Sequence, residues 1–355
     1  MRLGIIGLPQ SGKTTIFNAL TRGKQPIAAS AGRMEVHTGV VDVPDERVDK
    51  LSAIFKPRKT IYAKVTYADI AGLEGGEKTE IAGALLNQLS QMDGFIHVVR
   101  CFADENVPHS LGSINPARDL QAMEEEFILN DQIKVERKIT SLKEEKQKGG
   151  GREKVIVERE LALFEKLLVA LQAGQSLRML TLEAEEEAIL AGFGFLSRKP
   201  VLVVLNLGEG QAAPTLTFDQ PSSRVLPLQG KLEMDLAQLP PDEEEIFLKE
   251  YGIEEPSLSR MIRISYDLLG LQSFFTVGED EVRAWTVHRG ALAPEAAGTV
   301  HTDMQKGFIR AEVVAYADLM ALGSMAEVRA KGKLRLEGKT YPVQDGDILS
   351  IRFNV

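Results

Sequence analysis

Short apolar runs alternate with helical patterns over roughly the first hundred residues of the chain. Residues 3–6, 61–69 and 95–102 are predicted to be buried strands, and residues 201–206 and 224–228 show the same pattern much later. Strands that alternate with helices favour right-handed β-α-β units, and therefore an α/β fold whose parallel sheet is covered on both faces. The long gap between the two groups of strands indicates an insertion.

The insertion, residues 119–198, is highly charged and carries apolar residues at helical spacing in two arms. The apolar residues of the second arm are 4, 3, 4 and 3 residues apart, which is the spacing of a heptad seam. The two sets are Ile128, Val135, Ile139 and Leu142, then Val157, Leu161, Phe164, Leu168 and Leu171. Three glycines at 149–151 end the first arm and permit a reversal. We expect an antiparallel coiled-coil hairpin; a short bundle packed on the domain is the alternative.

The C-terminal part of the chain changes to short strand patterns separated by Gly and Asp turns. Residues 282–287, 308–314, 340–343 and 348–353 are the strand candidates, in a β-rich module of about 80 residues that is large enough for its own core. The expected organisation is an α/β domain from residues 1–118 and 199–272, a helical insertion at 119–198 and a β domain at 273–355.

Composition narrows the class of protein. The 355 residues are 44% hydrophobic and 26% charged, as in an ordinary globular protein, and no apolar run reaches the roughly 18 residues of a membrane span. The N-terminus enters a strand pattern without a signal-peptide core, and the single cysteine excludes an internal disulfide or a cysteine zinc site. These features favour a cytoplasmic protein. The net charge of −9 means that any RNA contact must come from a local basic patch.

The strongest motif is G-x-x-x-x-G-K-[ST] at residues 7–14, between a predicted strand and a predicted helix start. Its glycines let backbone N–H groups turn toward phosphate oxygens at a helix N-terminus. We expect Lys13 to reach the β- and γ-phosphates of a nucleotide, and the hydroxyl of Thr14 to bind Mg²⁺. The predicted phosphate site comprises Gly7, Pro9, Gln10, Ser11, Gly12, Lys13, Thr14, Thr15 and Gly72.

The tetrapeptide D-x-x-G at residues 69–72 supports a GTPase-like nucleotide site. Asp69 ends a predicted strand and can hold Mg²⁺ through water together with Thr14, and the N–H of Gly72 can meet a γ-phosphate. The next residue is Leu73, at the place where many such enzymes have a glutamine that positions water. A leucine cannot orient water, so the catalytic residues stay unassigned.

The predicted base site follows the strand at 201–206. The guanine signature N-K-x-D is replaced by Asn206, Leu207, Gly208 and Glu209. Adenine has no N2 amine for a carboxylate to accept from, whereas Asn206 could accept from its N6 amine and Leu207 could offer an apolar face. We therefore favour ATP over GTP; a strand-end turn unrelated to the base is the alternative. The predicted base-binding residues are Asn206, Leu207, Glu209, Gln229 and Gly230.

Together these motifs resemble the YchF family of Obg-like ATPases over nearly the whole chain. The segment 69–73 (DIAGL) is one mark, and the most specific are 281–287 (EVRAWTV), 301–313 (HTDMQKGFIRAEV) and 343–348 (VQDGDI). The resemblance implies a Ras-like P-loop NTPase domain with an inserted coiled coil and a C-terminal TGS domain of β-grasp type. It also implies an ATP preference, weak hydrolysis and association with ribosomes.

The chain departs from the family around both switch regions. Residues 31–37 are shortened and lack the threonine expected to close on Mg²⁺, residues 74–83 are poor in glycine, and Gln10 and Ser11 replace Asn and Val. One hypothesis is an ATP-dependent molecular switch with slow hydrolysis. Another is a nucleotide-binding scaffold with little or no hydrolysis. A small-molecule kinase is disfavoured, because the D-x-x-G motif and the TGS-like segment argue against it.

Basic residues gather where the helical hairpin should reverse. The tip residues that could contact RNA or the ribosome are Lys146, Lys148, Arg152 and Lys154. A solvated charged end is an equal alternative, and the absence of aromatic residues argues against base stacking there. His97, in a predicted central strand, is expected to be a packed core residue, and His37 a loop residue.

Overall fold

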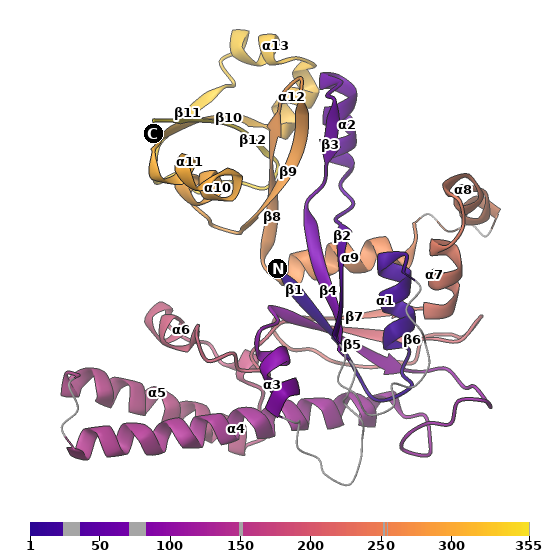
Figure 1. Ribbon diagram of the computed structural model, residues 1–355, viewed down its shortest axis with the longest axis vertical. Coiled ribbons are helices and arrows are strands. Elements are labelled where there is room, and N and C mark those ends of the chain that lie inside the picture. The colour runs from indigo at the N-terminus through magenta and orange to yellow at the C-terminus, as the bar shows by residue number, and fades with distance from the viewer. Residues whose placement is uncertain (24–35, 71–82, 149–151, 251–252, 254, 355) are drawn as a thin grey trace. The chain divides into compact units, whose positions relative to one another are not determined.

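The computed structural model describes residues 1–23, 36–70, 83–148, 152–250, 253 and 255–354 (Figure 1). The chain divides into two compact units, and both are discontinuous in sequence. The first comprises Met1–Gly39 and Thr66–Leu258, and the second comprises Val40–Val65 and Ser259–Val355. No helix among the described residues is long and apolar enough to cross a membrane.

The first unit is built on a six-stranded sheet in the order β2-β4-β1-β5-β6-β7. The neighbours from β4 to β7 pair in parallel, as the alternation of strands and helices predicts. The bounds are β1 Arg2–Ile6, β2 Val36–Asp42, β4 Lys64–Ile70, β5 Gly94–Arg100, β6 Val201–Asn206 and β7 Ser223–Leu228. The strands β5 and β6 are buried along their full length, which explains their continuous apolar runs.

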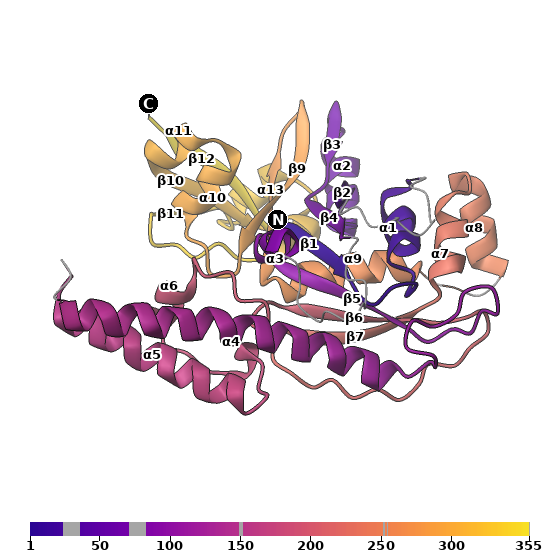
Figure 2. The ribbon, with the colours of Figure 1, turned by 60° about the horizontal axis from the view of Figure 1, so that its bottom comes forward.

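Helices cover both faces of this sheet (Figures 1 and 2). Apolar residues of α3 (Gly83–Ser90) and of the first turns of α4 join strand residues in one core cluster. The other face carries α1 (Lys13–Thr21) and α7 (Gly230–Ala237), which contact each other. The first unit also includes α8 (Pro241–Glu250). This arrangement confirms the predicted α/β fold.

The insertion is a helical hairpin, as expected (Figure 2). Its arms are α4 (Pro116–Lys148) and α5 (Lys154–Gln172). The seam residues of α5 differ in burial: Val157, Phe164 and Leu171 are buried, whereas Leu161 and Leu168 are half-buried. A second apolar stripe on α5, formed by Leu163 and Leu167, explains this difference. It belongs to the same apolar cluster as residues of the short helices η1 (Leu177–Met179) and α6 (Ala184–Leu190). The hairpin therefore has a third layer that the heptad pattern does not predict.

Buried acidic residues of α4 fix the hairpin to the segment between α5 and β6. The carboxylate of Asp131 is fully buried and accepts hydrogen bonds from the N–H of Leu196 at 2.9 Å and from the N–H and hydroxyl of Ser197 at 2.7 Å each. One α-helical heptad earlier, Glu124 pairs with Arg178 at 2.6 Å. Burial raises the pKa of Asp131 to about 6, although the three hydrogen bonds oppose this shift.

The second unit has a six-stranded sheet in the order β11-β10-β12-β8-β9-β3. Its strands are β3 Lys59–Ile61, β8 Leu271–Val277, β9 Glu281–His288, β10 Phe308–Ala315, β11 Arg335–Glu337 and β12 Asp347–Phe353. One face packs against α10 (Ala293–Val300), whose alanines allow a close approach to Phe274 and Val313. The other helices are α2 Glu46–Phe55, α9 Ser257–Leu268, α11 Thr302–Lys306, α12 Tyr316–Leu322 and α13 Met325–Ala330. The C-terminal part of this unit is a β domain, as expected, but α2, β3 and α9 lie outside the predicted range of 273–355.

Residues 40–65 belong to the second unit, although they run from the end of β2 to the start of β4, two strands of the first sheet. The strand β3 adds to β9 in parallel, and α2 packs on β8 and β9. Arg47 holds this segment in place: its guanidinium pairs with Asp45 at 2.8 Å and with Asp345 at 2.7 Å, and it lies 5.1 Å from the ring centroid of Phe275.

Two strand predictions need correction. The predicted strand at 61–69 is interrupted: β3 ends at Ile61, and β4 begins at Lys64 in the other sheet. The predicted strand at 340–343 is absent, because Pro342 forms only an isolated bridge with Leu292, and β11 takes the place next to β10. A proline lacks the N–H that a strand ladder needs.

Replacing Asp131 by Ala tests the anchor of the hairpin. The substitution leaves two N–H groups and a hydroxyl without their acceptor in the core. We expect the free energy of unfolding to fall by about 2–4 kcal/mol, measured by urea denaturation of the full chain. Asp235→Ala, at an exposed position of α7, is the matched control, and an equal loss in both variants would refute the anchor role.

The difference in unfolding free energy between the natural chain and Asp131→Ala should depend on pH. The folded pKa of Asp131, about 6, exceeds the ordinary unfolded value of about 3.9, so the folded chain binds the proton more tightly. This stabilising contribution is complete below about pH 4 and is lost as the pH rises through about 6. The stability difference between the natural chain and Asp131→Ala should therefore narrow between about pH 4 and about pH 6 and stay constant above that range.

Candidate functional site

The loop between β1 and α1 has the backbone that a phosphate cradle requires. Gly7 has φ 147° and Gly12 has φ 96°, both in the region that L side chains rarely adopt. A Cβ at Gly7 would lie 2.3 Å from the carbonyl oxygen of Val98, and one at Gly12 would lie 2.2 Å from Nδ2 of Asn206. Both glycines are therefore required by conformation and by close packing, as the motif predicts.

Lys13 begins α1, and its ammonium group reaches back over the loop. Its Nζ donates to the carbonyl oxygens of Gly7 at 3.0 Å and Leu8 at 2.9 Å. A cation in this position lies where the motif places the β- and γ-phosphates. The arrangement thus places a positive charge beside a helix N-terminus.

The remaining loop residues differ in their surroundings. Pro9 and Thr15 are half-buried, and Gln10 is exposed with a left-handed φ of 61°. The family pattern has asparagine at this position. Asparagine adopts that conformation more readily than glutamine, so the change to Gln10 costs local stability. The hydroxyl of Ser11 is buried and has no hydrogen-bond partner among the described residues.

Thr14 and Asp69 meet beside this loop, as the sequence predicts. The hydroxyl of Thr14 donates to Oδ2 of Asp69 at 2.8 Å, and Oδ1 of Asp69 is buried without a partner in the described part of the chain. Burial raises the pKa of Asp69, while Thr14 and the charge of Lys13 lower it. A poorly solvated carboxylate and a hydroxyl are oxygen ligands that fit Mg²⁺.

The metal would need further ligands from phosphate or water. Among the described residues, no group of three or more His, Cys, Asp or Glu side chains could hold a metal ion. Mg²⁺ is commonly held by one or two protein oxygens together with substrate phosphates, which matches Thr14 and Asp69. Gly72 and Leu73, and most of the altered switch segments, lie outside the described residues.

Asn206 lies under the phosphate loop and connects it to another loop. Its Nδ2 donates to the carbonyl oxygen of Ser11 at 2.9 Å, and its Oδ1 accepts from the N–H of Gly230 at 3.0 Å. The side chain is buried, and a Cβ at Gly230 would lie 2.8 Å from its Oδ1. The structure thus assigns Asn206 a linking role between β1 and β7 that the base-reading hypothesis did not include.

The other predicted base residues lie around the same edge of the sheet. Leu207 is buried in the core cluster, and its N–H donates to the carbonyl oxygen of Leu228 at 2.9 Å. Glu209 is exposed, and Gln229 is half-buried directly before α7. The carboxyl ends of β1, β5, β6 and β7 therefore bring the phosphate and base candidates to one edge, where α/β folds bind ligands.

Sequence reasoning missed two polar residues, Arg100 at the end of β5 and His109 in the segment between β5 and α4. Arg100 is buried, donates to the carbonyl oxygens of Phe102 at 3.1 Å and Val107 at 2.6 Å, and lies 4.5 Å from the ring centroid of Phe102. His109 pairs with Asp119 at 2.9 Å, with both side chains almost fully buried. Neither residue belongs to a short motif; a strand-end arginine and a loop histidine before α4 are weak signals.

His97 is a core residue, as expected. It is 1% exposed, and burial, together with the charges of Lys13 and Arg178, lowers its pKa to about 3. The imidazole therefore stays neutral at physiological pH. His37 lies on β2 and is half-buried, so it is a strand residue instead of the expected loop residue.

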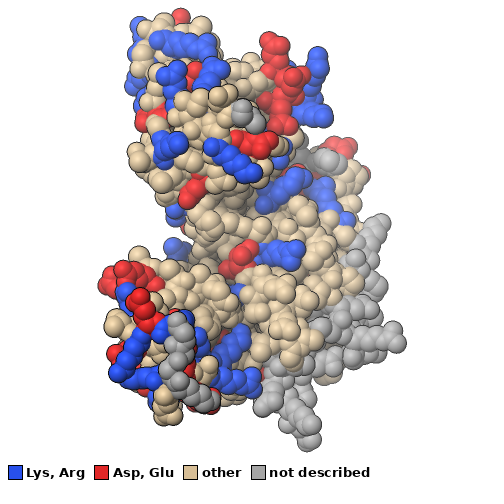
Figure 3. All heavy atoms as spheres, turned by 60° about the vertical axis from the view of Figure 1, so that its left-hand side comes forward, with Lys and Arg blue, Asp and Glu red and all other residues tan. Residues whose placement is uncertain are grey.

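Two of the four cations predicted at the hairpin tip are paired within the hairpin. Arg152 contacts Glu145 at 2.7 Å and Glu160 at 2.5 Å, and Lys146 contacts Glu158 at 3.0 Å. Lys154 is exposed. Figure 3 shows positive and negative side chains mixed on this part of the surface. The tip is thus a charged surface in which both signs alternate.

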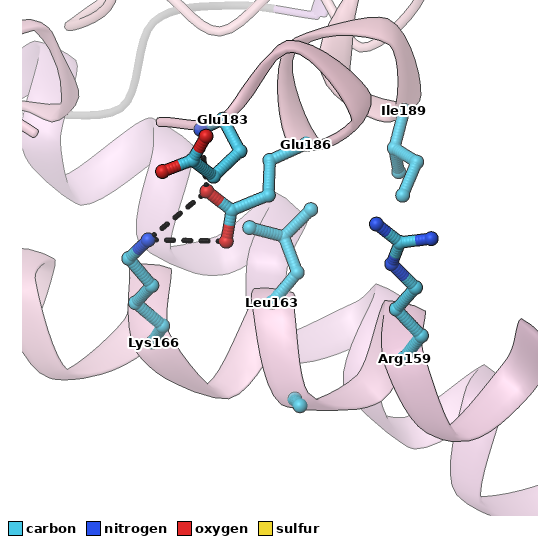
Figure 4. A pocket seen from close by; sticks show the side chains of 7 residues that line it. Arg159, Leu163, Lys166, Glu183, Glu186 and Ile189 are labelled. Atoms are coloured by element: carbon cyan, nitrogen blue, oxygen red, sulfur yellow. Dashed lines mark hydrogen bonds and ion pairs between the residues drawn. The ribbon is translucent and has the colours of Figure 1, made fainter. Parts of the chain in front are cut away.

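A pocket on the insertion lies apart from the phosphate loop, between α5 and α6 (Figure 4). Leu163 and Ile189 form apolar walls, and Lys166 pairs with Glu186 at 3.1 Å across it. Arg159 forms a second ion pair with Glu185. Because both cations are paired, this pocket lacks the unbalanced positive charge that a triphosphate requires.

The sheet, the phosphate loop and the Thr14–Asp69 contact define a Ras-like P-loop NTPase with a helical insertion and a C-terminal β domain. Two family models match: MMR_HSR1, described as a 50S ribosome-binding GTPase, at residues 2–138, and YchF-GTPase_C, described as a protein of unknown function, at residues 271–354.

Relatives match over the whole chain. A ribosome-binding ATPase YchF of Escherichia coli O157:H7 is 40% identical, with 100% of this chain and 99% of the relative covered. Another, from Bacillus subtilis strain 168, is 39% identical, with 99% of each covered. The solved structure of the Schizosaccharomyces pombe YchF GTPase matches with a TM-score of 0.85 at 29% identity, covering 99% of this chain and 97% of that one. The chain belongs to the YchF family.

Asn206→Asp separates the linking role from a base-reading role. An aspartate can still accept from Gly230, but it cannot donate to the carbonyl oxygen of Ser11. We expect the affinities for Mg²⁺–ATP and for Mg²⁺–triphosphate to fall together, by about tenfold, in calorimetric titrations.

Asn87→Asp, at an exposed position of α3, is the matched control for charge and composition. If the variant lost affinity for ATP but kept the natural affinity for triphosphate, Asn206 would act on the base and not on the phosphate loop.

Proposed function

We propose that this protein is a slow, ATP-preferring P-loop NTPase that acts as a nucleotide-dependent switch on ribosomes. The observation that carries the proposal is the convergence of Lys13, Thr14 and Asp69 at the phosphate loop. A cation and two oxygen ligands at this point suit a triphosphate with Mg²⁺. Lys13 would bind the phosphates, and Thr14 and Asp69 would hold the metal, which neutralises charge on the phosphates.

The preference for ATP rests on the residues that replace the guanine signature. Leu207 replaces the lysine of that signature and is buried, and Glu209 replaces its aspartate and is exposed at the tip of a turn. The curated relatives are named ATPases, whereas the solved relative is named a GTPase. A direct comparison of the two nucleotides therefore decides this part of the proposal.

The slow-hydrolysis part rests on the altered switch residues of the sequence. Leu73 cannot orient water, and the shortened segment 31–37 lacks the threonine of the family pattern. The alternative is a scaffold that binds nucleotide with little or no hydrolysis. A switch must turn over its bound nucleotide, whereas a scaffold need not.

The domain boundaries belong to the same proposal. We assign residues 1–118 and 199–272 to the NTPase domain, 119–198 to the helical insertion and 273–355 to the TGS domain. The separate apolar clusters of the insertion and of the β domain support this division. Residues 40–65 and 259–272, which cluster with the second compact unit, are the parts in which these bounds differ from the two units.

The ribosome is the proposed partner, and the cytoplasm the proposed location. The relatives are named as ribosome-binding proteins. The proposed contacts are the TGS domain and the tip residues Lys146, Lys148, Arg152 and Lys154. Because Arg152 and Lys146 are paired with glutamates, the exposed Lys154 is the tip cation that we select for the test.

A side-by-side titration of Mg²⁺–ATP and Mg²⁺–GTP tests the nucleotide proposal. We expect ATP to bind about fivefold tighter or more, and single-turnover hydrolysis of bound ATP to be slower than in a family member with unaltered switches. Complete absence of turnover would favour the scaffold. Hydrolysis as fast as in such a family member would contradict slow turnover.

Lys13→Ala is the control that validates the site itself. It removes the cation over the phosphate loop, so binding of both nucleotides should be abolished. An unchanged affinity in this variant would refute the phosphate-site assignment. Lys50→Ala, at an exposed position of α2, controls for the loss of a lysine.

Lys154→Glu tests the tip contact by co-sedimentation with ribosomes. A phosphate contact replaced by a like charge should weaken association about two- to fivefold, with a smaller difference at higher salt. Lys231→Glu, at an exposed position of α7, is the matched control. Equal association of both variants at every salt concentration would exclude Lys154 from the interface.

A further inference from the structure

A tight turn directly after β6 carries the residue that replaces the guanine-reading aspartate. The N–H of Gln211 donates to the carbonyl oxygen of Gly208 at 3.2 Å, and Gly210 has φ 64°. A positive φ at the third position of a four-residue turn requires glycine. The turn therefore presents Glu209 at its exposed tip.

The side-chain amide of Gln211 ties this turn to the neighbouring loop. Its Oε1 accepts from the N–H of Gly208 at 2.8 Å, and its Nε2 donates to the carbonyl oxygen of Cys101 at 2.8 Å. Cys101 follows β5, and its N–H donates to the carbonyl oxygen of Asn206 at 2.9 Å. Gln211 thus joins the ends of β5 and β6 beyond their last ladder hydrogen bond.

The loop after β5, to which Gln211 binds, is itself held in place by Arg100. Arg100 donates to the carbonyl oxygens of Phe102 and Val107 from a buried position, so the chain after β5 is fixed from inside. A Cβ at Gly208 would lie 3.3 Å from Oε1 of Gln211 and 3.5 Å from Cβ of Phe102. Gly208 therefore fits closely between Gln211 and Phe102, and the turn is held against a fixed surface.

The two amides at this edge perform the same task for different pairs of loops. Asn206 joins the loop after β1 to the loop after β7, and Gln211 joins the loop after β5 to the loop after β6. A neutral amide suits this task, because it offers a donor and an acceptor on one planar group. Asn206 supports the phosphate side of the site, and Gln211 supports the base side.

We propose that Gln211 is a positioning residue for base recognition, which sets the place of Gly208 and Glu209 without contributing to phosphate binding. This inference rests on the proposed nucleotide-binding function. Gln211 is exposed, so its loss should disturb the turn and leave the buried core intact. Its effect should therefore appear in the discrimination between bases and not in the affinity for phosphate.

The test compares Gln211→Ala and Gln211→Glu with the natural chain, using Mg²⁺–ATP, Mg²⁺–GTP and inorganic triphosphate. We expect ATP affinity to fall about three- to tenfold, the ATP-to-GTP ratio to move toward one, and triphosphate affinity to stay within about twofold. Gln211→Glu keeps the acceptor for Gly208 but places an acceptor against the carbonyl oxygen of Cys101, so it should resemble Gln211→Ala.

Gln238→Ala, at an exposed position after α7, is the matched control. A loss of triphosphate affinity equal to the loss for nucleotides would overturn the proposal, because Gln211 would then act on the phosphate site. Unchanged ATP and GTP affinities would also overturn it. Failure of the proposed function is distinguishable, because it would show as nucleotide binding that survives Lys13→Ala.

Discussion

The hydrogen bonds of one buried amide, Asn206, are the constraint on which the candidate site depends. A parallel sheet brings the loops after β1, β6 and β7 to one edge, but it leaves the loops free to adopt many conformations. Asn206 removes this freedom because it binds Ser11 and Gly230 at the same time. Gly12 and Gly230 pack so closely against it that neither position has room for a side chain.

The second unit depends on a comparable constraint at Arg47. The segment that contains it leaves the first sheet after β2 and returns through β4, which ends beside the phosphate loop. Between those strands, Arg47, Asp345 and the β3–β9 pairing hold the segment to the β-grasp sheet. The chain between β2 and β4 is therefore built into the second folded unit.

The inserted hairpin combines an apolar seam with a buried polar anchor. The seam favours pairing of α4 with α5, but apolar contacts alone specify the register weakly. Asp131 and Glu124 bind particular N–H, hydroxyl and guanidinium groups of residues 176–197, so they fix the hairpin to the segment that leads into β6. The raised pKa of Asp131 reflects the free-energy cost of keeping a charged carboxylate in a buried environment.

Local patterns in the sequence determined the phosphate loop, the strands β1, β5, β6 and β7, and the two hairpin helices. Each of these depends on neighbouring residues: glycines at φ-positive positions, continuous apolar runs, and a heptad repeat. Family-specific segments also indicated the C-terminal β domain.

Only the tertiary structure decided what Asn206, Gln211, Arg47 and Asp131 do. Their partners lie far away in sequence, and a single Asn, Gln, Arg or Asp has no pattern that reveals a distant partner. The same reason explains the interrupted strand at 61–69: its first residue pairs with β9, more than two hundred residues later. Local chemistry sets the type of each element, whereas long-range hydrogen bonds and packing decide which elements meet.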